Sequence, residues 1–291
     1  VKNCSCSQTC FKIWENGYIK MKKTILESFS LKDHVVILTG SSGFLGREFA
    51  YTISDAGGNV ILVDKETKKN KKLESDIIKK YKTKPMVCNV DITNKIEVSK
   101  MVKTVIDKYK KINSLVNNAV FHPNTKTLNV KSTFDKFPLD LWEQSLSINL
   151  TGPLFLCQEV GKFMKKEQDG TIVNISSIYG MLGADQRIYG KSGLDSPISY
   201  AVTKGGILNF TKYLAAYWNR NNIRVNTLSL GGVENRKYMS SKFIHNYSEK
   251  TILGRMAKKD EYNAALLFLL SNASKYMTGS NLVIDGGWTA W

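Results

Sequence analysis

The sequence contains no long apolar run and no apolar stretch near its N-terminus. A membrane-spanning helix needs roughly 20 predominantly apolar residues in succession, and a secretory signal needs an apolar segment close to the start. A membrane protein and a secreted protein are therefore both disfavoured. The sequence predicts a cytoplasmic protein without a membrane partner.

Arginine is scarce although the formal net charge is +17, since six of the 42 basic residues are arginine and the others are lysine. Proteins that bind phosphates and bases favour arginine for its planar guanidinium fork. The densest lysine run, from Lys65 to Lys84, also contains acidic residues, which is typical of the solvated face of a helix. The sequence therefore disfavours a nucleic-acid partner and favours a small-molecule substrate.

Candidate metal ligands are few and scattered. Three of the five cysteines lie within the first ten residues, and no second cluster of cysteine and histidine accompanies them. A structural zinc site needs about four such ligands, so no metal site is predicted. The odd number of cysteines argues against a disulfide framework and suits a reducing compartment.

Short apolar strands alternate with helical patterns from Lys32 onward. His34–Thr39 is continuously apolar and β-branched, as expected for a strand that is buried on both faces. This alternation predicts an α/β fold, a single doubly wound parallel sheet of the Rossmann type over residues 31–291. Further strands are expected at Asn59–Val63, Met86–Val90, Ser114–Asn117, Thr171–Ser176, Ile223–Leu228 and Asn281–Ile284. Helices are expected after Gly43, over the lysine-rich run, and at Thr93–Tyr109, Leu139–Lys166, Pro197–Arg220 and Asp260–Ser271.

Residues 1–30 do not share this pattern and are interpreted as an N-terminal extension. Met21 opens a plausible start of the protein, and the preceding residues are polar and rich in cysteine. We expect native translation to begin at Met21. The alternative is a real but disordered arm.

The segment Thr39–Gly46 joins the first strand to the first helix and contains three glycines. Glycines there let the backbone turn tightly and approach a pyrophosphate, which the helix N-terminus stabilises. Asp64 ends the second strand, where a carboxylate accepts from the ribose hydroxyls of NAD and repels the 2′-phosphate of NADP. The sequence therefore predicts NAD, with NADP as the alternative because Lys65 follows. The contacts expected in the turn are Gly40, Ser42, Gly43, Phe44, Leu45 and Gly46.

Tyr200 and Lys204 lie four residues apart near the start of a predicted helix, so both side chains share one face. A free tyrosine has a pKa near 10, and a neighbouring ammonium favours its phenolate form. Lowering this pKa by about three units requires roughly 4 kcal/mol. We expect Lys204 and the positive charge of oxidised nicotinamide to supply it in a desolvated cleft, which makes Tyr200 the predicted proton-exchanging group.

Four further motifs follow in order along the chain: Asn117-Asn118-Ala119, Asn174-Ile175-Ser176-Ser177, Tyr200 with Lys204, and Ile284-Asp285-Gly286-Gly287. With them, the chain from about Leu31 onward resembles the short-chain dehydrogenase/reductase family. The resemblance implies hydride transfer between NAD(P) and an alcohol or ketone, in a homodimer or homotetramer. It implies that Ser177 hydrogen-bonds the substrate oxygen, that Lys204 also holds the nicotinamide ribose, and that Asn149 positions a water in the proton relay. The other cofactor contacts that it implies are Asp91 and Ile92 beside the adenine, Asn118, Ala119, Gly232 and Val233.

Three features depart from the usual family pattern. Phe44 stands where single-domain members usually carry glycine, and Val120 replaces the glycine that commonly follows the Asn-Asn-Ala motif. Ser177 and Tyr200 are 23 residues apart, a longer separation than is usual. The extra stretch, around Met181–Ser196, is expected to arch beside the active site.

The long insert and the runs around Ser177 and Gly231 are similar to the flagellin-modification protein A-type dehydrogenases of bacterial surface-sugar gene clusters. That resemblance implies a sugar or sugar-nucleotide substrate. Arg187 in the insert is the expected contact for a phosphate or carboxylate of such a substrate. The alternatives are a 3-oxoacyl-thioester reductase and, from another class, a non-catalytic dinucleotide-sensing module on the same fold.

Overall fold

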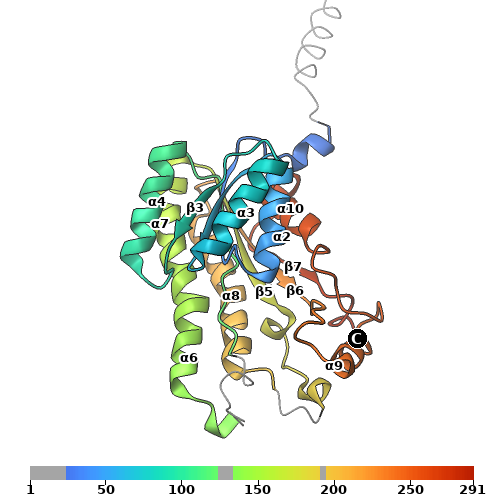
Figure 1. The fold of residues 1–291 in the computed structure, drawn as a ribbon. Coiled ribbons are helices and arrows are strands. Elements are labelled where there is room, and N and C mark those ends of the chain that lie inside the picture. The colour runs from blue at the N-terminus through green and yellow to red at the C-terminus, as the bar shows by residue number, and fades with distance from the viewer. Residues whose placement is uncertain (1–23, 124–133, 191–194) are drawn as a thin grey trace, which may run out of the picture.

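The computed structural model describes residues 24–123, 134–190 and 195–291 (Figure 1). The expected start at Met21 lies outside the described residues, and so do residues 191–194 of the expected insert. Within the described part of the chain, no helix is both long and apolar enough to cross a membrane.

Seven parallel strands form one sheet in the order β3-β2-β1-β4-β5-β6-β7, which confirms the predicted doubly wound α/β fold. The order reverses between β1 and β4, because the chain returns to the middle of the sheet after β3. The strands are β1 (Val35–Thr39), β2 (Asn59–Asp64), β3 (Met86–Asn89), β4 (Ser114–Asn117), β5 (Gly170–Ser177), β6 (Ile223–Leu230) and β7 (Asn281–Ile284).

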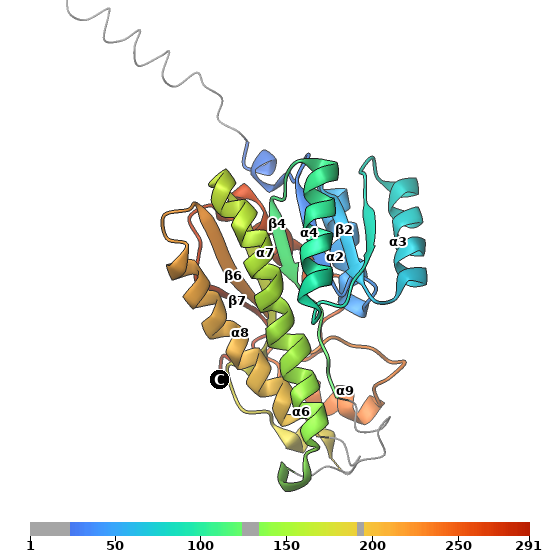
Figure 2. The ribbon, with the colours of Figure 1, turned by 90° about the vertical axis from the view of Figure 1, so that its left-hand side faces the viewer.

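Helices cover both faces of this sheet (Figure 2). They are α2 (Phe44–Asp55), α3 (Thr67–Lys80), α4 (Lys95–Tyr109), α6 (Leu139–Leu146), α7 (Gly152–Glu167), α8 (Ile198–Tyr217), α9 (Ser241–Ser248) and α10 (Asn263–Leu270). Short 3-10 turns lie at Leu26–Phe29, Phe134–Lys136, Ile178–Gly180, Gln186–Tyr189 and Asn272–Ser274.

Alternate residues of each central strand pack into two separate hydrophobic cores, one on each face of the sheet. In β1, Val35 and Ile37 pack into the core under α4, α7 and α8, whereas Val36 and Leu38 pack into the core under α2, α3 and α10. This follows from the two-residue repeat of a strand, since successive side chains point to opposite faces. The continuous apolar run at this position is therefore needed to fill both cores.

The segment predicted as one helix, Leu139–Lys166, is divided by a π-helical stretch at Ser147–Thr151. A π-helical turn adds one residue and turns the following side chains to a new direction, and such turns often lie at functional sites. Here the stretch contains Asn149. Its end at Gly152 packs tightly, because a Cβ on that residue would lie 2.7 Å from the Ile92 side chain.

The structure also contains a helix that the sequence did not predict. α9 follows β6 and is capped by Ser240, whose hydroxyl accepts a hydrogen bond from the amide of Phe243 at 3.2 Å. It has only eight residues, too few to show a clear helical period. α9 packs against the 3-10 turn Gln186–Tyr189 of the insert, and together they cover the carboxyl end of the sheet.

Candidate active site

One cavity of about 630 Å³ lies at the carboxyl ends of the strands, where the sheet order reverses. This edge is where open α/β sheets bind their ligands. Every residue that the sequence suggested for cofactor contact lines the cavity: Gly40, Ser42, Gly43, Phe44, Leu45, Gly46, Asp64, Asp91, Ile92, Asn118, Ala119, Tyr200, Lys204, Gly232 and Val233. Ser177 lines it as well.

The glycine-rich turn forms one end of the cavity and leaves no room for side chains. Gly40 has a φ of +64°, and a Cβ on it would lie 2.8 Å from the Cα of Ala119. A Cβ on Gly46 would lie 2.0 Å from the carbonyl oxygen of Gly40. Asn118 fixes the turn by donating from Nδ2 to the carbonyl oxygens of Thr39 and Gly40 at 3.0 and 3.2 Å. The turn thus presents bare backbone at the N-terminus of α2, which fits the pyrophosphate of a dinucleotide.

Asp64, at the end of β2, is held with its carboxylate in the cavity wall. Its Oδ2 accepts hydrogen bonds from the amide and hydroxyl of Ser42 at 3.1 and 2.8 Å. The ammonium of Lys65 is directed to Asp91, 2.6 Å away. Although burial alone raises the pKa of Asp91, the hydrogen bonds from Lys65 and Thr93 hold it below its usual value. Asp91 therefore neutralises the ammonium of Lys65, the residue that follows Asp64.

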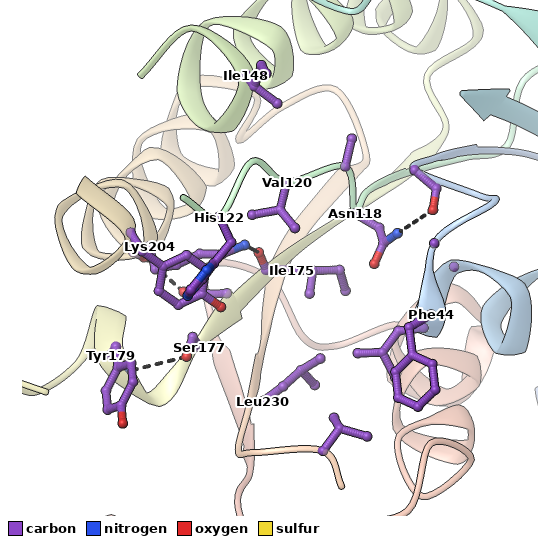
Figure 3. A pocket seen from close by; sticks show the side chains of 18 of the residues that line it. Phe44, Asn118, Val120, His122, Ile148, Ile175, Ser177, Tyr179, Lys204 and Leu230 are labelled. Atoms are coloured by element: carbon purple, nitrogen blue, oxygen red, sulfur yellow. Dashed lines mark hydrogen bonds between the residues drawn. The ribbon is translucent and has the colours of Figure 1, made fainter. Parts of the chain in front are cut away.

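Ser177 and Lys204 lie at the other end of the cavity (Figure 3), and Tyr200 lines it with them. Ser177 ends β5, and the other two lie one turn apart on α8. The Lys204 Nζ donates to the carbonyl oxygen of Ile175 at 2.7 Å and lies 5.6 Å from the centre of the Tyr200 ring. Ser176 ties the strand to the helix, because its hydroxyl donates to the Lys204 carbonyl oxygen at 2.8 Å.

Burial shifts both ionisable groups toward their neutral forms. It lowers the pKa of Lys204 to about 8, since the ammonium leaves water for a site where only 5% of the residue is exposed. Burial also raises the pKa of Tyr200, and a hydrogen bond with Ser177 offsets this only in part. The predicted fall in the Tyr200 pKa is therefore not a property of these side chains alone, because loss of hydration outweighs the hydrogen bond with Ser177.

Asn149 does not line the cavity but is buried directly behind it. Its Oδ1 accepts from the amide of Phe121 at 2.7 Å, and its Nδ2 donates to the Phe121 carbonyl oxygen at 2.9 Å and to the Thr203 hydroxyl at 3.1 Å. The side chain thus ties the π-helical stretch to the loop after β4 and to α8. Its role in a proton relay stays a prediction.

The sequence did not single out the aromatic residues that line the cavity beyond Ser177. Tyr189, from the insert, packs against Phe243 of α9 with ring centres 5.2 Å apart. The hydroxyl of Tyr179 is buried and has no hydrogen-bond partner of good geometry in the described part of the chain. His122 and Tyr247 also belong to this group, and Met239 and Met256 line the cavity beside them. The density of aromatic residues in the run 238–247 is a signal that could have drawn attention to Phe243 and Tyr247.

Arg187 is the one sequence-suggested contact that lies on the outer surface. Its side chain is 83% exposed, and its Nε and Nη2 donate to the two carboxylate oxygens of Asp185 at 2.7 and 2.8 Å. Asp185 also pairs with Lys250 at 3.1 Å. Arg187 does not line the cavity, whereas Tyr189, two residues further, does.

Comparison with known proteins agrees with this geometry. A family model described as enoyl-(acyl carrier protein) reductase matches residues 41–289. The chain is 30% identical over 258 residues to post-translational flagellin modification protein A of Campylobacter coli, which covers 89% of this chain and 99% of that protein. It is 29% identical over 259 residues to a 3-oxoacyl-(acyl-carrier-protein) reductase of Aquifex aeolicus, which covers 88% and 98%.

Solved structures show the same fold with dinucleotides bound. A short-chain dehydrogenase of Leptospira borgpetersenii with bound NAD+ is 33% identical, with a TM-score of 0.77 over 90% of this chain and 95% of that one. A gluconate 5-dehydrogenase of Burkholderia cenocepacia in complex with NADP and tartrate is 26% identical, with a TM-score of 0.80 over 91% and 99%.

The sheet, the glycine turn and the cluster of Ser177, Tyr200 and Lys204 thus define an NAD(P)-dependent oxidoreductase that acts on CH–OH groups. The family model extends over most of the chain, and the flagellin modification protein is matched almost end to end. The chain belongs to the short-chain dehydrogenase/reductase family.

Proposed function

We propose that this enzyme interconverts an alcohol and a ketone on a sugar or sugar nucleotide used in surface-glycan biosynthesis, such as flagellin modification, with NAD as the preferred cofactor. The observation that carries the proposal is the aromatic wall beside Ser177, in which the phenol groups of Tyr179 and Tyr189 line the cavity. A sugar ring offers CH groups to an aromatic face and hydroxyls to phenol oxygens.

The residues that surround the cofactor cavity suit NAD. The glycine turn would hold the pyrophosphate, Asp64 the adenosine ribose, and Asp91 would lie beside the adenine. The Lys65 ammonium pairs with Asp91, whereas the Asp64 carboxylate accepts a hydrogen bond from the Ser42 hydroxyl in the cavity wall. A 2′-phosphate would meet that carboxylate, so NADP is disfavoured.

Three side chains would carry out the proton chemistry. When bound, the nicotinamide supplies the hydride acceptor or donor. The Ser177 hydroxyl donates a hydrogen bond to the substrate oxygen, and the Tyr200 phenol oxygen exchanges a proton with it. Lys204, buried and charged below a pH of about 8, favours the phenolate form of Tyr200 as that proton moves.

A 3-oxoacyl-thioester reductase is the second candidate. It is favoured by the similarity to the Aquifex aeolicus reductase, which is nearly as high as that to the flagellin modification protein. The insert between Ser177 and Tyr200 argues against it, because a linear acyl chain needs no wall of phenol groups. A non-catalytic dinucleotide-sensing module is a third candidate, and the intact cluster of Ser177, Tyr200 and Lys204 argues against that one.

A turnover assay separates these candidates. The purified protein is incubated with NAD or NADH and with sugars, sugar nucleotides, polyols and 3-oxoacyl thioesters, and the absorbance of NADH is followed. The proposal expects the highest kcat/KM on a sugar-type substrate. A preference for 3-oxoacyl thioesters would establish the second candidate, and tight NAD binding with no turnover of any class would support the third.

Two further parts of the proposal concern binding. Arg187 is proposed to contact an anionic group of a sugar nucleotide, which requires its guanidinium to leave Asp185. The protein is also proposed to form a homodimer or homotetramer through the outer faces of α7 and α8, where Leu154, Tyr213 and Tyr217 are exposed. Analytical ultracentrifugation tests this, and a monomer at assay concentrations would exclude it.

A further inference from the structure

His122 lies in the active-site cavity, and no role described above uses it. It follows β4 in the loop that begins with Asn118 and Ala119, and it lines the cavity together with Val120. Its imidazole meets the ring of Tyr200 at an angle of 62°, with ring centres 4.7 Å apart. Figure 3 shows His122 at the end of the cavity that contains Lys204 and Ser177, away from Phe44 and Asn118. The imidazole thus stands next to the group that exchanges the substrate proton.

The imidazole is neutral at physiological pH. Loss of hydration in the cleft lowers the pKa of His122, the charge of Lys204 lowers it further, and contacts with the backbone at His122 and Pro123 oppose this only in part. A neutral imidazole has one N–H donor and one bare nitrogen that accepts. Hydrogen bonds with the backbone at His122 and Pro123 use the N–H, so the other ring nitrogen is left to accept, and a hydroxyl is the neutral substituent that donates to it.

The position of that hydroxyl follows from the contact with Tyr200. The phenol oxygen of Tyr200 must reach the oxygen on the reacting carbon for proton exchange. Because the imidazole packs against the same ring, the part of the substrate that it reaches lies next to the reacting carbon. A second hydroxyl there makes the substrate a vicinal diol and the product an α-hydroxy ketone.

We propose that His122 binds a hydroxyl on the carbon next to the reacting carbon, and so selects vicinal diols over simple alcohols. This inference rests on the proposed action on sugars and narrows it, because neighbouring hydroxyls are what a sugar ring presents. His122 is a substrate-binding residue in this scheme. A 3-oxoacyl thioester has no hydroxyl at that carbon and would gain nothing from the imidazole.

The test compares cis-1,2-cyclohexanediol with cyclohexanol, two probes that differ by one hydroxyl. The ratio of their kcat/KM values is measured for the wild type, His122→Phe and His122→Gln. Losing one hydrogen bond of about 1.4 kcal/mol corresponds to about tenfold, so His122→Phe should lower the ratio by about that factor. His122→Gln retains an acceptor for the hydroxyl and should restore part of the ratio. An unchanged ratio in His122→Phe would overturn the proposal.

A second measurement does not depend on turnover. The protein is labelled with ¹⁵N-histidine and saturated with NAD, and the imidazole signals are assigned with His122→Gln and, as a matched control on the exposed face of α9, His245→Gln. The diol should shift the His122 signal and leave that of His245 in place, and cyclohexanol should shift neither. A His122 signal that does not respond to the diol would also overturn the proposal. If that signal responds but no sugar is turned over, the function proposed above fails while the role of His122 stands.

Discussion

The ammonium of Lys204 is kept in a place that costs the protein stability. Only 5% of the residue is exposed, its Nζ is bonded to the carbonyl oxygen of Ile175, and burial lowers its pKa from 10.5 to about 8. That shift corresponds to about 3 kcal/mol of lost hydration in the folded state. The proton exchange proposed for Tyr200 is the reason we give for retaining this charge.

Replacing Lys204 with methionine should therefore give a protein that is inactive but more stable. The folded pKa lies below the unfolded one, so the penalty is fully present below pH 8 and disappears as the pH rises toward 10.5. We expect Lys204→Met to unfold at a higher urea concentration than the wild type at pH 7. Its free energy of unfolding should be larger by at most about 3 kcal/mol. The gain should shrink between pH 8 and 10. A variant that is less stable than the wild type at pH 7 would contradict the view that burial of the Lys204 ammonium destabilises the folded state.

Tyr200→Phe should abolish turnover and leave cofactor affinity intact. The ring and its contact with His122 are kept, and only the phenol oxygen that exchanges the proton is lost. General acid–base catalysis contributes about 10² to 10⁴ in rate, so kcat should fall by that range. Quenching of protein fluorescence by NADH measures the cofactor Kd in the same sample. An unchanged kcat would remove Tyr200 from the mechanism.

Cofactor choice should depend on Asp64. Asp64→Ala removes the carboxylate that would face a 2′-phosphate, and the ratio of kcat/KM for NAD over NADP should fall by about tenfold or more. Glu66→Ala is the matched control, since it removes a carboxylate two residues further on that does not line the cavity. Similar use of both cofactors by the wild type would show that Asp64 does not select between them.

Among the elements, the insert between β5 and α8 is expected to govern substrate affinity. Tyr189→Leu removes a phenol from the cavity wall and should raise the substrate KM with little effect on the KM for NAD. Arg187→Ala is the informative companion, because Arg187 lies in the same 3-10 turn but points to Asp185. An increase in substrate KM for Arg187→Ala as well would show that the guanidinium leaves Asp185 for an anionic substrate. If neither variant changes the substrate KM, the insert is not a specificity element.

The elements also show what sequence periodicity resolves and what it misses. The run 139–166 has a continuous helical pattern, and the structure keeps it helical throughout, yet the π-helical stretch at Ser147–Thr151 leaves no mark in that pattern. Its presence depends on distant contacts, among them the bonds from Asn149 to Phe121 and Thr203. Such contacts are set by tertiary packing, so single-sequence patterns do not contain them.

For the whole molecule, the sheet was predictable because each central strand contributes side chains to both hydrophobic cores. A strand buried on both faces has to be apolar at every position, which is how the run around Ile37 stands out. The cofactor side of the cavity was predictable for a related reason, because Gly40 follows β1, Gly46 lies in the first turn of the next helix, and Asp64 ends β2. Conformational requirements of this kind are local, so the residue types at these positions reveal them.

The substrate side was not predictable in the same way. It is assembled from the loop after β4, the insert and α9, which meet only in the folded chain. The sequence drew attention to Arg187 because it is polar and lies in the insert, while the cavity is lined by Tyr189, Phe243 and His122. A loop fixes its side-chain directions through contacts with other loops, so residue type alone did not identify which members face inward.

The place of β7 as the last strand along the chain has a consequence for how the protein is made. β6 pairs on one side with β5 and on the other with β7, and about 50 residues separate the end of β6 from the start of β7. At roughly 5–20 residues per second, a ribosome needs several seconds to deliver them. Throughout that interval the growing chain already contains Ser177, Tyr200 and Lys204, but one edge of β6 has its backbone amides and carbonyls unpaired. An open edge of this kind is a template for pairing with other chains, and the arrival of β7 replaces the eight-residue edge of β6 with a four-residue edge, which is a weaker template.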